Sequence, residues 1–332
     1  MGTRAVTLQD VADAAGFSIT TTSDALSGGG RVSAATVERI EHVASRLGYL
    51  PNAAARHLRK ARTGSIGVYL PPPLELTRTN YYMNVAFGAV ERAGKDGVDV
   101  TLLAGHHVPR PRVDGIVLVD PAADDPTAAA LARAGLPVVS GERYPGAPAP
   151  TASVRTDHAA ALTELLEHLR EGGSRRPALL AVRGSFDWAR TIRTTYLRWC
   201  RSLDLEPRMR TMAGDSSVSS VPGHARALLR HFPEADALVL APDGSAVAAL
   251  EAAREAGRRV GGGGDLMIAA CVDGPVLELC DPAVTAIDLR PREFGRACAD
   301  ALLGQIDRAD PAEARIHAVE LRRRASTHPL KR

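Results

Sequence analysis

Residues 7–48, TLQDVADAAGFSITTTSDALSGGGRVSAATVERIEHVASRLG, decide the fold of the first part of the chain. From Leu8 onward, apolar residues recur at i, i+3, i+4 and i+7, which places them on one face of a helix. Thr7 is a suitable N-cap for this helix, and Gly16 is suited to end it in a tight turn. The stretch therefore begins with a short amphipathic helix that is followed by a turn.

A second helix is predicted over residues 19–26, with Ser18 as its cap. It is unusual because Thr20, Thr21 and Thr22 follow one another. Branching at Cβ restricts the χ1 angle against the preceding turn, so three successive threonines are poor helix formers. A reason other than helix propensity must account for these hydroxyl groups.

A third helix is predicted between Ser33, a suitable N-cap, and Gly48, a suitable end. Three short helices, of which the first two are joined by a tight turn with a glycine, describe a helix-turn-helix unit. The second helix of such a unit lies in the DNA major groove, where short hydroxyl groups can bond to phosphates or base edges. The alternative is a small alanine-rich helical bundle with no role in DNA binding.

The distribution of charge favours DNA binding. The chain has 332 residues, with 41 Lys and Arg against 38 Asp and Glu. Residues 1–63 hold eight of the basic and five of the acidic residues, which leaves 33 of each for the rest. The whole net charge of +3 therefore belongs to the first segment, and half of its basic residues lie between Arg56 and Arg62. Such a local excess indicates contact with a polyanion.

The first seventy residues resemble the LacI/GalR family of transcriptional regulators. The family motifs TLxDVAxxAG, VSxxTxxRI, GYxPNxxAxxL and TGSIGV occur in order, as TLQDVADAAG, VSAATVERI, GYLPNAAARHL and TGSIGV. The resemblance implies a helix-turn-helix head over residues 1–48, a hinge helix and linker over 49–63, and a core over 64–332 that binds an effector and dimerises. It also implies a homodimer that binds a pseudo-palindromic operator in double-stranded DNA.

Residues 49–63 resemble the family's hinge. Pro51 disfavours helix at the residue before it, and Asn52 can cap a helix that continues to Lys60 and is too short to be stable alone. In the family such a helix folds when two chains pair on DNA. Its leucine, which is Leu58 here, then wedges between base pairs in the minor groove and kinks the DNA. The alternative is a linker with a solvated basic face.

The resemblance also implies which residues contact DNA. These are Thr7, Ser18, Ile19, Thr20, Thr21, Ser23 and Asp24 in the head and Asn52, Ala55, Arg56, Leu58 and Arg59 in the hinge. We expect Ile19, Thr20 and Asp24 to face base edges, whereas Ser18, Thr21 and Ser23 should face phosphates. Thr22 stands where the family commonly has valine, and Asp24 stands where it commonly has arginine. An ionised carboxylate can only accept hydrogen bonds, which favours a cytosine opposite Asp24. The alternative is that Asp24 points away from the bases.

From Gly64 onward, short apolar runs alternate with helical segments. The runs lack the period-2 polarity of half-buried strands, and they predict buried parallel strands at 65–70, 99–103, 114–119, 137–141, 177–182, 237–241, 266–271 and 283–288. Helices are predicted between them at 84–96, 158–171, 187–203, 222–231 and 244–257. This alternation predicts an α/β, doubly wound fold, and its length suits two lobes with a cleft between them.

The resemblance implies a core like that of periplasmic sugar-binding proteins, in which the chain crosses between the lobes near Asp157, Asp288 and Ala318. Ligands of such sheets bind beyond the carboxyl ends of the strands. The residues at the family's cleft positions, which should contact a small-molecule effector such as a sugar, are Tyr81, Tyr82, Trp188, Arg190, Arg193, Asp243 and Asp273. Carboxylates and guanidinium groups bond to sugar hydroxyls, and aromatic rings stack on the C–H face. Without the resemblance, Asp243 would be interpreted as a helix cap and the aromatic rings as core residues.

Two features depart from the family pattern. Residues 104–112 alone separate two predicted strands, whereas a parallel crossover needs about a dozen residues and usually a helix, so the family's helix is expected to be missing. Aromatic residues make up 4% of the chain, which leaves few rings for stacking. The alternative function is therefore a regulator of the same family that has lost its sugar response or answers to a non-sugar ligand.

Other classes of protein find no support in the sequence. Cys200, Cys271, Cys280 and Cys298 have no metal-binding spacing, and we expect no metal, no cofactor and no catalytic residue. There is no GxSxG motif, no Walker motif and no plausible catalytic triad, so an enzyme is not expected. There is no run of about 18 apolar residues, and no secretory signal is recognised, so no membrane contact is expected. The expected protein is a cytoplasmic, nucleoid-associated repressor.

Overall fold

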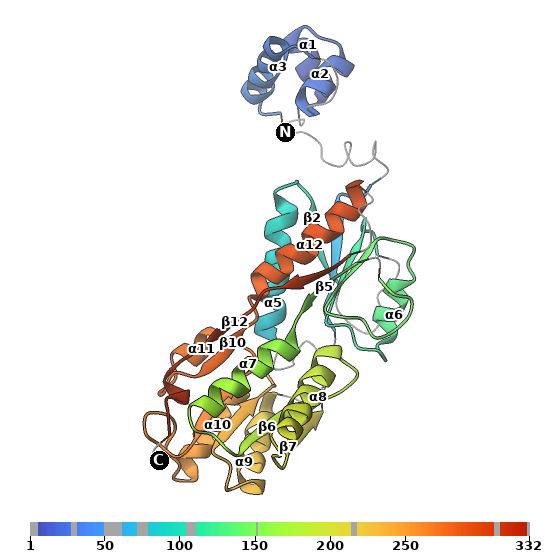
Figure 1. The fold of residues 1–332 in the computed structure, drawn as a ribbon. Coiled ribbons are helices and arrows are strands. Elements are labelled where there is room, and N and C mark those ends of the chain that lie inside the picture. Colours follow the sequence, from blue (N-terminus) through green and yellow to red (C-terminus); the bar gives the residue numbers. More distant parts are fainter. Residues whose placement is uncertain are drawn as a thin grey trace. The chain divides into compact units, whose positions relative to one another are not determined.

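A computed structural model describes residues 6–27, 32–49, 62–71, 79–103, 111–150, 152–213, 218–308 and 313–330. The chain divides into two compact units, a head of residues 1–63 and a core of residues 64–332 (Figure 1). The core contains two six-stranded sheets, and each is covered by helices. The predicted fold class, an all-α head followed by a two-lobed α/β core, is confirmed.

The head consists of three helices around a small apolar core. The helices are α1 (Leu8–Ala15), α2 (Ile19–Ser27) and α3 (Ala34–Leu47). Thr7 and Asp10 form a reciprocal capping box at the start of α1, and Gly16 ends that helix with a left-handed backbone, φ +77°. Val11, Ile40 and the other buried apolar residues of the head make one cluster. The predicted helix-turn-helix is therefore present.

The first lobe of the core is built on sheet A. Its strands are, in spatial order, β11 (Ala314–His317), β5 (Ala152–Thr156), β4 (Val138–Gly141), β3 (Ile116–Val119), β1 (Ser65–Tyr69) and β2 (Asp99–Leu103). All neighbouring strands of this sheet run parallel. The helices of this lobe are α5 (Thr79–Gly94), α6 (Pro126–Ala132) and α12 (Pro291–Arg308). In Figure 1, α5 and α12 lie on the opposite side of the lobe from α6.

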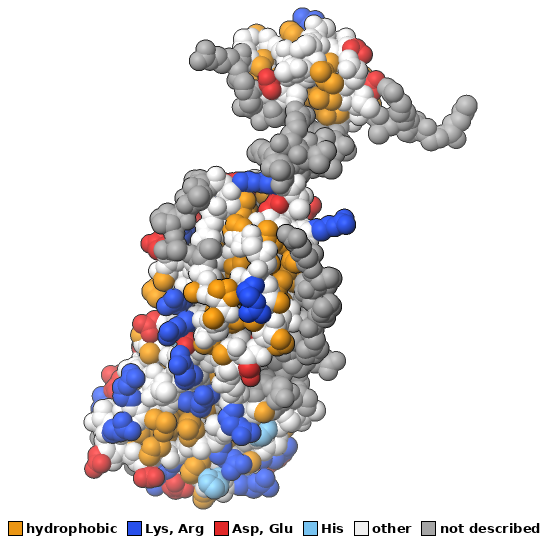
Figure 2. Space-filling model, turned by 90° about the vertical axis from the view of Figure 1, so that its right-hand side faces the viewer, with side chains coloured by type: hydrophobic (Ala, Val, Ile, Leu, Met, Phe, Trp, Pro, Cys, Tyr) orange, Lys and Arg blue, Asp and Glu red, His pale blue; other side chains and the backbone are white. Residues whose placement is uncertain are grey.

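The second lobe is built on sheet B. Its strands are β12 (Glu320–Arg322), β10 (Thr285–Asp288), β9 (Met267–Ala270), β8 (Ala237–Leu240), β6 (Pro177–Arg183) and β7 (Arg208–Ala213). They are parallel except that β12 runs antiparallel to β10. The helices are α7 (His158–Glu171), α8 (Asp187–Ser202), α9 (Val221–His231), α10 (Ser245–Glu255) and α11 (Pro275–Glu278), with short 3₁₀ turns η1 (Val218–Ser220) and η2 (Ala325–Thr327). Arg and Lys side chains are frequent on the face of this lobe in Figure 2.

The chain passes between the two sheets three times. It leaves sheet A after Thr156 and returns after Asp288, because α12 packs against β3, β4 and β5. It leaves sheet A again between His317 and Glu320. Three such passages mean that each lobe is built from segments that lie far apart in the sequence.

All eight runs that were predicted as strands are strands, and the five predicted helices are present. One interpretation is wrong, since β2 is an exposed edge strand and not a buried one: Leu102 keeps 47% of its surface exposed. The elements that were not predicted are β5, β7, β11, β12, α6, α11 and α12. Several of these strands alternate charged with apolar residues, as in RMRTMA of β7, and such a pattern does not look like a buried strand.

The short connection between β2 and β3 crosses over β1. Its described part, residues 111–115, contains no helix. Residues 104–110 lie outside the described residues, so the expected loss of the family's crossover helix remains a prediction.

Helices α5 and α12 pack closely because each contributes a glycine to the contact. A methyl group at Gly88 would lie 2.0 Å from the carbonyl oxygen of Arg292, and one at Gly295 would lie 1.9 Å from that of Val85. Both contacts are with backbone, which cannot give way as a side chain can. The two glycines therefore fix how closely α12 approaches α5.

We predict that Gly88→Ala and Gly295→Ala each lower the free energy of unfolding by about 2 kcal/mol, because the added methyl forces the helices apart. Gly94→Ala is the matched control on α5, since no atom lies within 4 Å of the added methyl there. Urea unfolding followed by circular dichroism measures both. Equal stability of the Gly88 and Gly94 variants would show that the close contact is not required.

Candidate functional site

The exposed surface of α2 is the candidate DNA-reading surface of the head. Ser18 directly precedes the helix, and its hydroxyl accepts a hydrogen bond from the backbone N–H of Thr21 at 3.0 Å and lies 2.8 Å from the Thr21 hydroxyl. Ile19 is 45% exposed, and Thr20 is exposed as well. The start of α2 therefore exposes the side chains of Ile19 and Thr20 beside the hydrogen-bonded hydroxyl groups of Ser18 and Thr21.

The three successive threonines point in three directions, because neighbouring helical residues are separated by about 100°. Thr20 faces solvent, and Thr21 is half-buried beside Ser18. Thr22 is fully buried, and its hydroxyl finds no hydrogen-bond partner among the described residues. Thr20 is therefore a surface residue, Thr21 lies beside the cap residue Ser18, and Thr22 is a core residue.

The remaining predicted DNA contacts in the head differ in exposure. Thr7 is exposed, but its hydroxyl belongs to the capping box of α1. Asp24 is half-buried, and Ser23 is 9% exposed, so Ser23 has little surface to offer a phosphate. The hinge contacts predicted at Asn52, Ala55, Arg56, Leu58 and Arg59 lie outside the described residues.

In the core, the loops that follow the strands of the two sheets meet. Ser185, which follows β6 of sheet B, donates a hydrogen bond to Asp124, which follows β3 of sheet A. A second contact of this kind joins the two lobes: Gly274, which follows β9 of sheet B, lies close to Asn80 at the start of α5 in the lobe of sheet A. The carboxyl ends of both sheets thus face one another, which is where parallel sheets bind ligands. This interlobe region is the candidate effector cleft.

The aromatic rings expected in the cleft are mostly covered. Tyr81 and Tyr82 are each 3% exposed and contact one another edge to face, with 5.7 Å between ring centres. Trp188 is 5% exposed and stacks on the half-buried Phe186. Stacking of a sugar on a ring face of Tyr81, Tyr82 or Trp188 is therefore not available in this structure. Phe186, which was not predicted, offers more surface.

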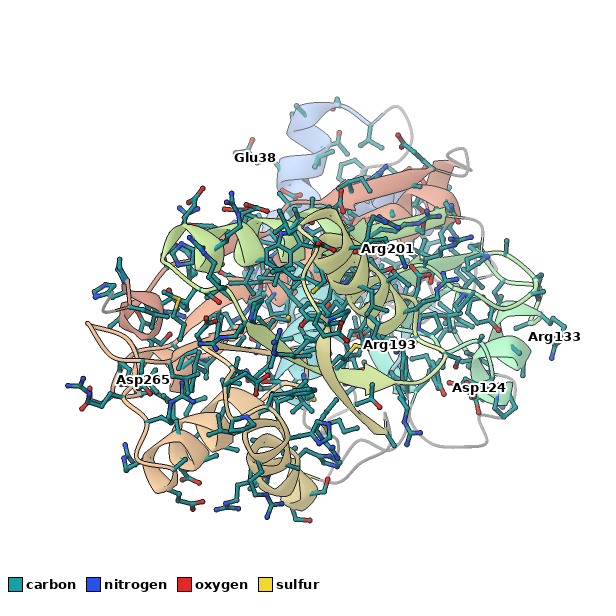
Figure 3. All side chains as sticks on the ribbon, turned by 60° about the horizontal axis from the view of Figure 1, so that its bottom comes forward. Glu38, Asp124, Arg133, Arg193, Arg201 and Asp265 are labelled. Carbon is teal, nitrogen blue, oxygen red and sulfur yellow. The ribbon has the colours of Figure 1, made fainter. Side chains whose placement is uncertain are left out.

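The two arginines expected in the cleft are placed differently. Arg193 lies on α8, and its guanidinium donates to the carbonyl oxygen of Val182 near the end of β6 (Figure 3). Burial and the charge of Arg190 lower the pKa of Arg193. Arg190 is itself more than half exposed and forms an ion pair with Asp187. Arg193 is thus the better placed of the two to meet a ligand between the lobes.

The two predicted aspartates both follow strands of sheet B. Asp243 follows β8 and is half-buried; it is not the N-cap of α10, because that position belongs to Gly244. Asp273 follows β9 and is held by a bidentate ion pair with Arg324, at 2.9 and 2.8 Å. The hydrogen bond to Asp273 raises the pKa of Arg324. Asp273 is therefore a fixed acceptor whose charge is already balanced.

A polar cluster that sequence reasoning missed lies at the carboxyl ends of β3, β4 and β5. Glu142 and His158 form an almost fully buried pair with 3.3 Å between Oε1 and Nε2, and Asp120 is buried beside them in the fold. Burial acts to raise the pKa of Glu142, but the charge of His158 and hydrogen bonds from His158 and Thr156 outweigh it and lower that pKa. Asp120 and Glu142 also adopt left-handed backbones, with φ of 44° and 70°. Strain of this kind concentrates at ligand and switch sites.

The sequence did contain a signal for this cluster. The apolar runs of β3 and β4 are each followed at once by an acidic residue, as in VLVD and VVSGE, and Asp157 and His158 follow β5. Because parallel strands end at the same edge of a sheet, such residues are brought together.

Comparisons with known proteins agree with this architecture. The profile for bacterial regulatory proteins of the lacI family matches residues 7–52, and that for a periplasmic binding protein-like domain matches residues 166–327. The transcriptional regulator CelR of Thermobifida fusca is 30% identical over 324 residues, which cover 91% of this chain and 93% of CelR. The chain belongs to the LacI family of bacterial regulatory proteins.

Other LacI-family proteins are similar over nearly the whole chain. The lactose operon repressor of Escherichia coli is 28% identical over 306 residues, which cover 90% of this regulator and 84% of the repressor. A structure of the Lac repressor dimer bound to operator and an anti-inducer has a TM-score of 0.77 at 25% identity, with 98% and 99% of the two chains covered. A CelR–cellobiose complex has a TM-score of 0.71 at 25% identity, with 97% and 99% covered. This LacI-family protein is thus a transcriptional regulator with a helix-turn-helix DNA-binding domain.

None of the helices in the described parts of this regulator combines the length and hydropathy that crossing a membrane requires.

We predict that Thr22→Val stabilises the head of this LacI-family regulator by about 1 kcal/mol, because it removes a buried hydroxyl that has no partner. Hydrogen exchange of the α1–α3 amides in the full chain measures the change as slower exchange. Thr20→Val is the matched control: it makes the same chemical change at an exposed position and should not slow exchange. The prediction fails if both variants exchange alike.

Proposed function

We propose that this regulator is a repressor that binds a pseudo-palindromic operator as a homodimer and is controlled by a small molecule, a sugar, in the interlobe cleft. The observation that carries the proposal is the surface of α2, where Ile19 and Thr20 are exposed on a helix whose other side is anchored in the core of the head. A rigid helix with short exposed side chains fits the major groove. The proposal divides the chain into a head over residues 1–48, a hinge over 49–63 and a core over 64–332.

Within the major groove, the side chains of α2 would have distinct tasks. Ile19 offers an apolar contact to a thymine methyl group, and Thr20 can bond to a base edge. Ser18 and Thr21 lie side by side at the start of the helix, where the helix dipole and free N–H groups favour a phosphate. Asp24 would accept from a cytosine amino group. Ser23 contributes less, because it is nearly buried.

The hinge would complete the interface in the minor groove. In this proposal Leu58 wedges between base pairs, Asn52 and Ala55 belong to the same short helix, and Arg56 and Arg59 neutralise phosphates. Such a helix is too short to persist alone, so its folding would depend on a second chain.

Exposed apolar side chains support the proposed homodimer. Phe87 and Val90 on α5 are each 48% exposed, Val276 on α11 is 53% exposed, and Leu279, which directly follows α11, is 85% exposed. Both helices lie along the same side of the core in Figure 1. Apolar side chains gathered on one side of a core are typical of a subunit interface. The Lac repressor structure with a similar fold is a dimer on its operator.

The cleft supports control by a small molecule. Arg193, Asp243 and the Asp273–Arg324 pair supply donors and acceptors at the strand ends of one lobe. The similar CelR structure holds cellobiose, and the named relatives include regulators of maltose and lactose genes. Ligand and DNA would then bind with reciprocal coupling through the positions of the lobes. The burial of Tyr81, Tyr82 and Trp188 favours the alternative of a non-sugar ligand, since it removes their stacking faces.

Selection of binding sites from a random DNA pool tests the DNA part of the proposal. We expect an inverted repeat, because two identical heads bind, with cytosine facing Asp24 in each half-site. Asp24→Arg should replace that preference with guanine, which arginine can bond in two places.

The matched control is Asp13→Arg, which makes the same change of charge on the exposed side of α1. It should strengthen binding to all DNA and leave the half-site preference unchanged. An unaltered preference in Asp24→Arg would show that Asp24 reads no base, and a selected site without an inverted repeat would count against the homodimer.

Calorimetry with cellobiose, maltose and lactose tests the effector. We expect saturable binding of a sugar by the wild-type protein, and Asp243→Ala should weaken it about ten-fold or more, since a buried polar contact would be lost. Operator affinity without sugar should not change. Glu251→Ala, at an exposed position on α10, is the control. Operator binding without any sugar binding would overturn the sugar but not the DNA-binding part of the proposal.

A further inference from the structure

A groove of about 580 Å³ lies between α9 and α10 on the outside of sheet B. Its lining includes Pro233, which precedes β8, and Arg258, which precedes β9. The groove therefore lies at the amino ends of these strands, whereas the interlobe cleft lies at their carboxyl ends. It is a separate site, and its volume falls in the range of small-molecule sites.

Three guanidinium groups line this groove, and two of them are held in place. Arg258 donates to the carbonyl oxygens of Pro233, Ala235 and Asp265, at 2.9 to 3.0 Å, and forms an ion pair with the Asp265 carboxylate. Arg226 forms a bidentate pair with Glu255, at 2.7 and 2.8 Å. These bonds fix the positions of two cationic groups before any ligand arrives.

Arg230 is the third guanidinium and differs from the other two. It is exposed, and no hydrogen bond or ion pair to it is seen within the described parts of the chain. Glu255 and Asp265 balance the charges of Arg226 and Arg258, so Arg230 is the one guanidinium of the lining that is left without a carboxylate among the described residues. The groove thus favours an anion.

The rest of the lining is apolar. Leu229 and Ala252 are buried at 6% and 4% exposure, and Ala256 and Pro233 lie beside them. A small inorganic ion would leave this surface wet. An apolar ring or chain attached to the anionic group would cover it and gain from its burial.

We propose that this groove is a second ligand site, for a small organic anion in which a phosphate or carboxylate is attached to an apolar body. Arg230 binds the anionic oxygens, because a free guanidinium can make two parallel bonds to such a group. Arg226 keeps N–H groups that Glu255 does not use and adds to the site. The proposal depends neither on the operator nor on an effector in the cleft.

Calorimetry on the full chain with phenyl phosphate as the probe tests the site. We expect saturable binding of one molecule per chain. Inorganic phosphate, which lacks the apolar ring, and phenol, which lacks the anionic group, should each bind about ten-fold more weakly or worse. Benzoate is the second probe: whichever of benzoate and phenyl phosphate binds more tightly identifies the anionic group.

Two variants address the two halves of the site. Arg230→Glu should weaken phenyl phosphate binding about ten-fold or more, whereas Arg201→Glu, the same change on α8 (Figure 3), should not. Ala256→Trp should also remove binding while every charge is kept, because the ring fills the apolar part of the groove. Circular dichroism confirms that the variants are folded.

The proposal is overturned if phenyl phosphate binding is not saturable, if phenol or inorganic phosphate binds as well as phenyl phosphate, or if Arg230→Glu and Arg201→Glu have equal effects. It is also overturned if Asp243→Ala in the cleft abolishes binding and Arg230→Glu does not, since the probe would then occupy the cleft.

Discussion

The three passages of the chain between the two sheets constrain everything that the core can do. Two of them are bonded to one another, since His317 at the last passage lies 3.2 Å from the carbonyl oxygen of Leu289 at the second, and His158, just after the first, pairs with Glu142 at the end of β4. Three chain connections between the lobes resist sliding of the lobes but leave rotation about the passages as the softer motion. A ligand between the lobes would act on that rotation, because it contacts both sides of the same axis.

The same constraint explains why charged groups are buried at the strand ends. A buried carboxylate is costly unless it is paired, and Glu142 and Asp273 are both paired, with His158 and with Arg324. Arg324 follows the third passage, so its bond to Asp273 also holds the end of the chain against β9. The strand ends thus combine fixed charge with fixed geometry, and a site of this kind is prepared before its ligand arrives.

The sequence predicted those elements whose residue pattern is typical of a single kind of secondary structure. The helices of the head follow from periodicity and caps, and the eight strands of the core follow from continuous apolar runs, with five helices between them. Strands such as β7 were missed because they lie at an edge and alternate Arg with Met and Thr, and α12 was missed because its place depends on glycines that meet α5 in space. Residues implied by resemblance, such as Tyr81 and Trp188, were placed at the right end of the sheets, but their burial depends on packing that no local pattern contains.

The three successive threonines of α2 have low helix propensity, yet each occupies a different environment in the helix. A helix that enters a major groove needs small exposed side chains on one side and core contacts on the other, and a start that is firmly capped. Thr20, Thr21 and Thr22 occupy these three environments in succession, and the hydroxyl is useful in two of them. In the third, Thr22 buries a hydroxyl without a partner among the described residues, although an apolar side chain of the same shape would fit. The head therefore gives up stability at the buried Thr22, whereas the hydroxyl of Thr20 is exposed and that of Thr21 lies beside Ser18 at the start of the helix.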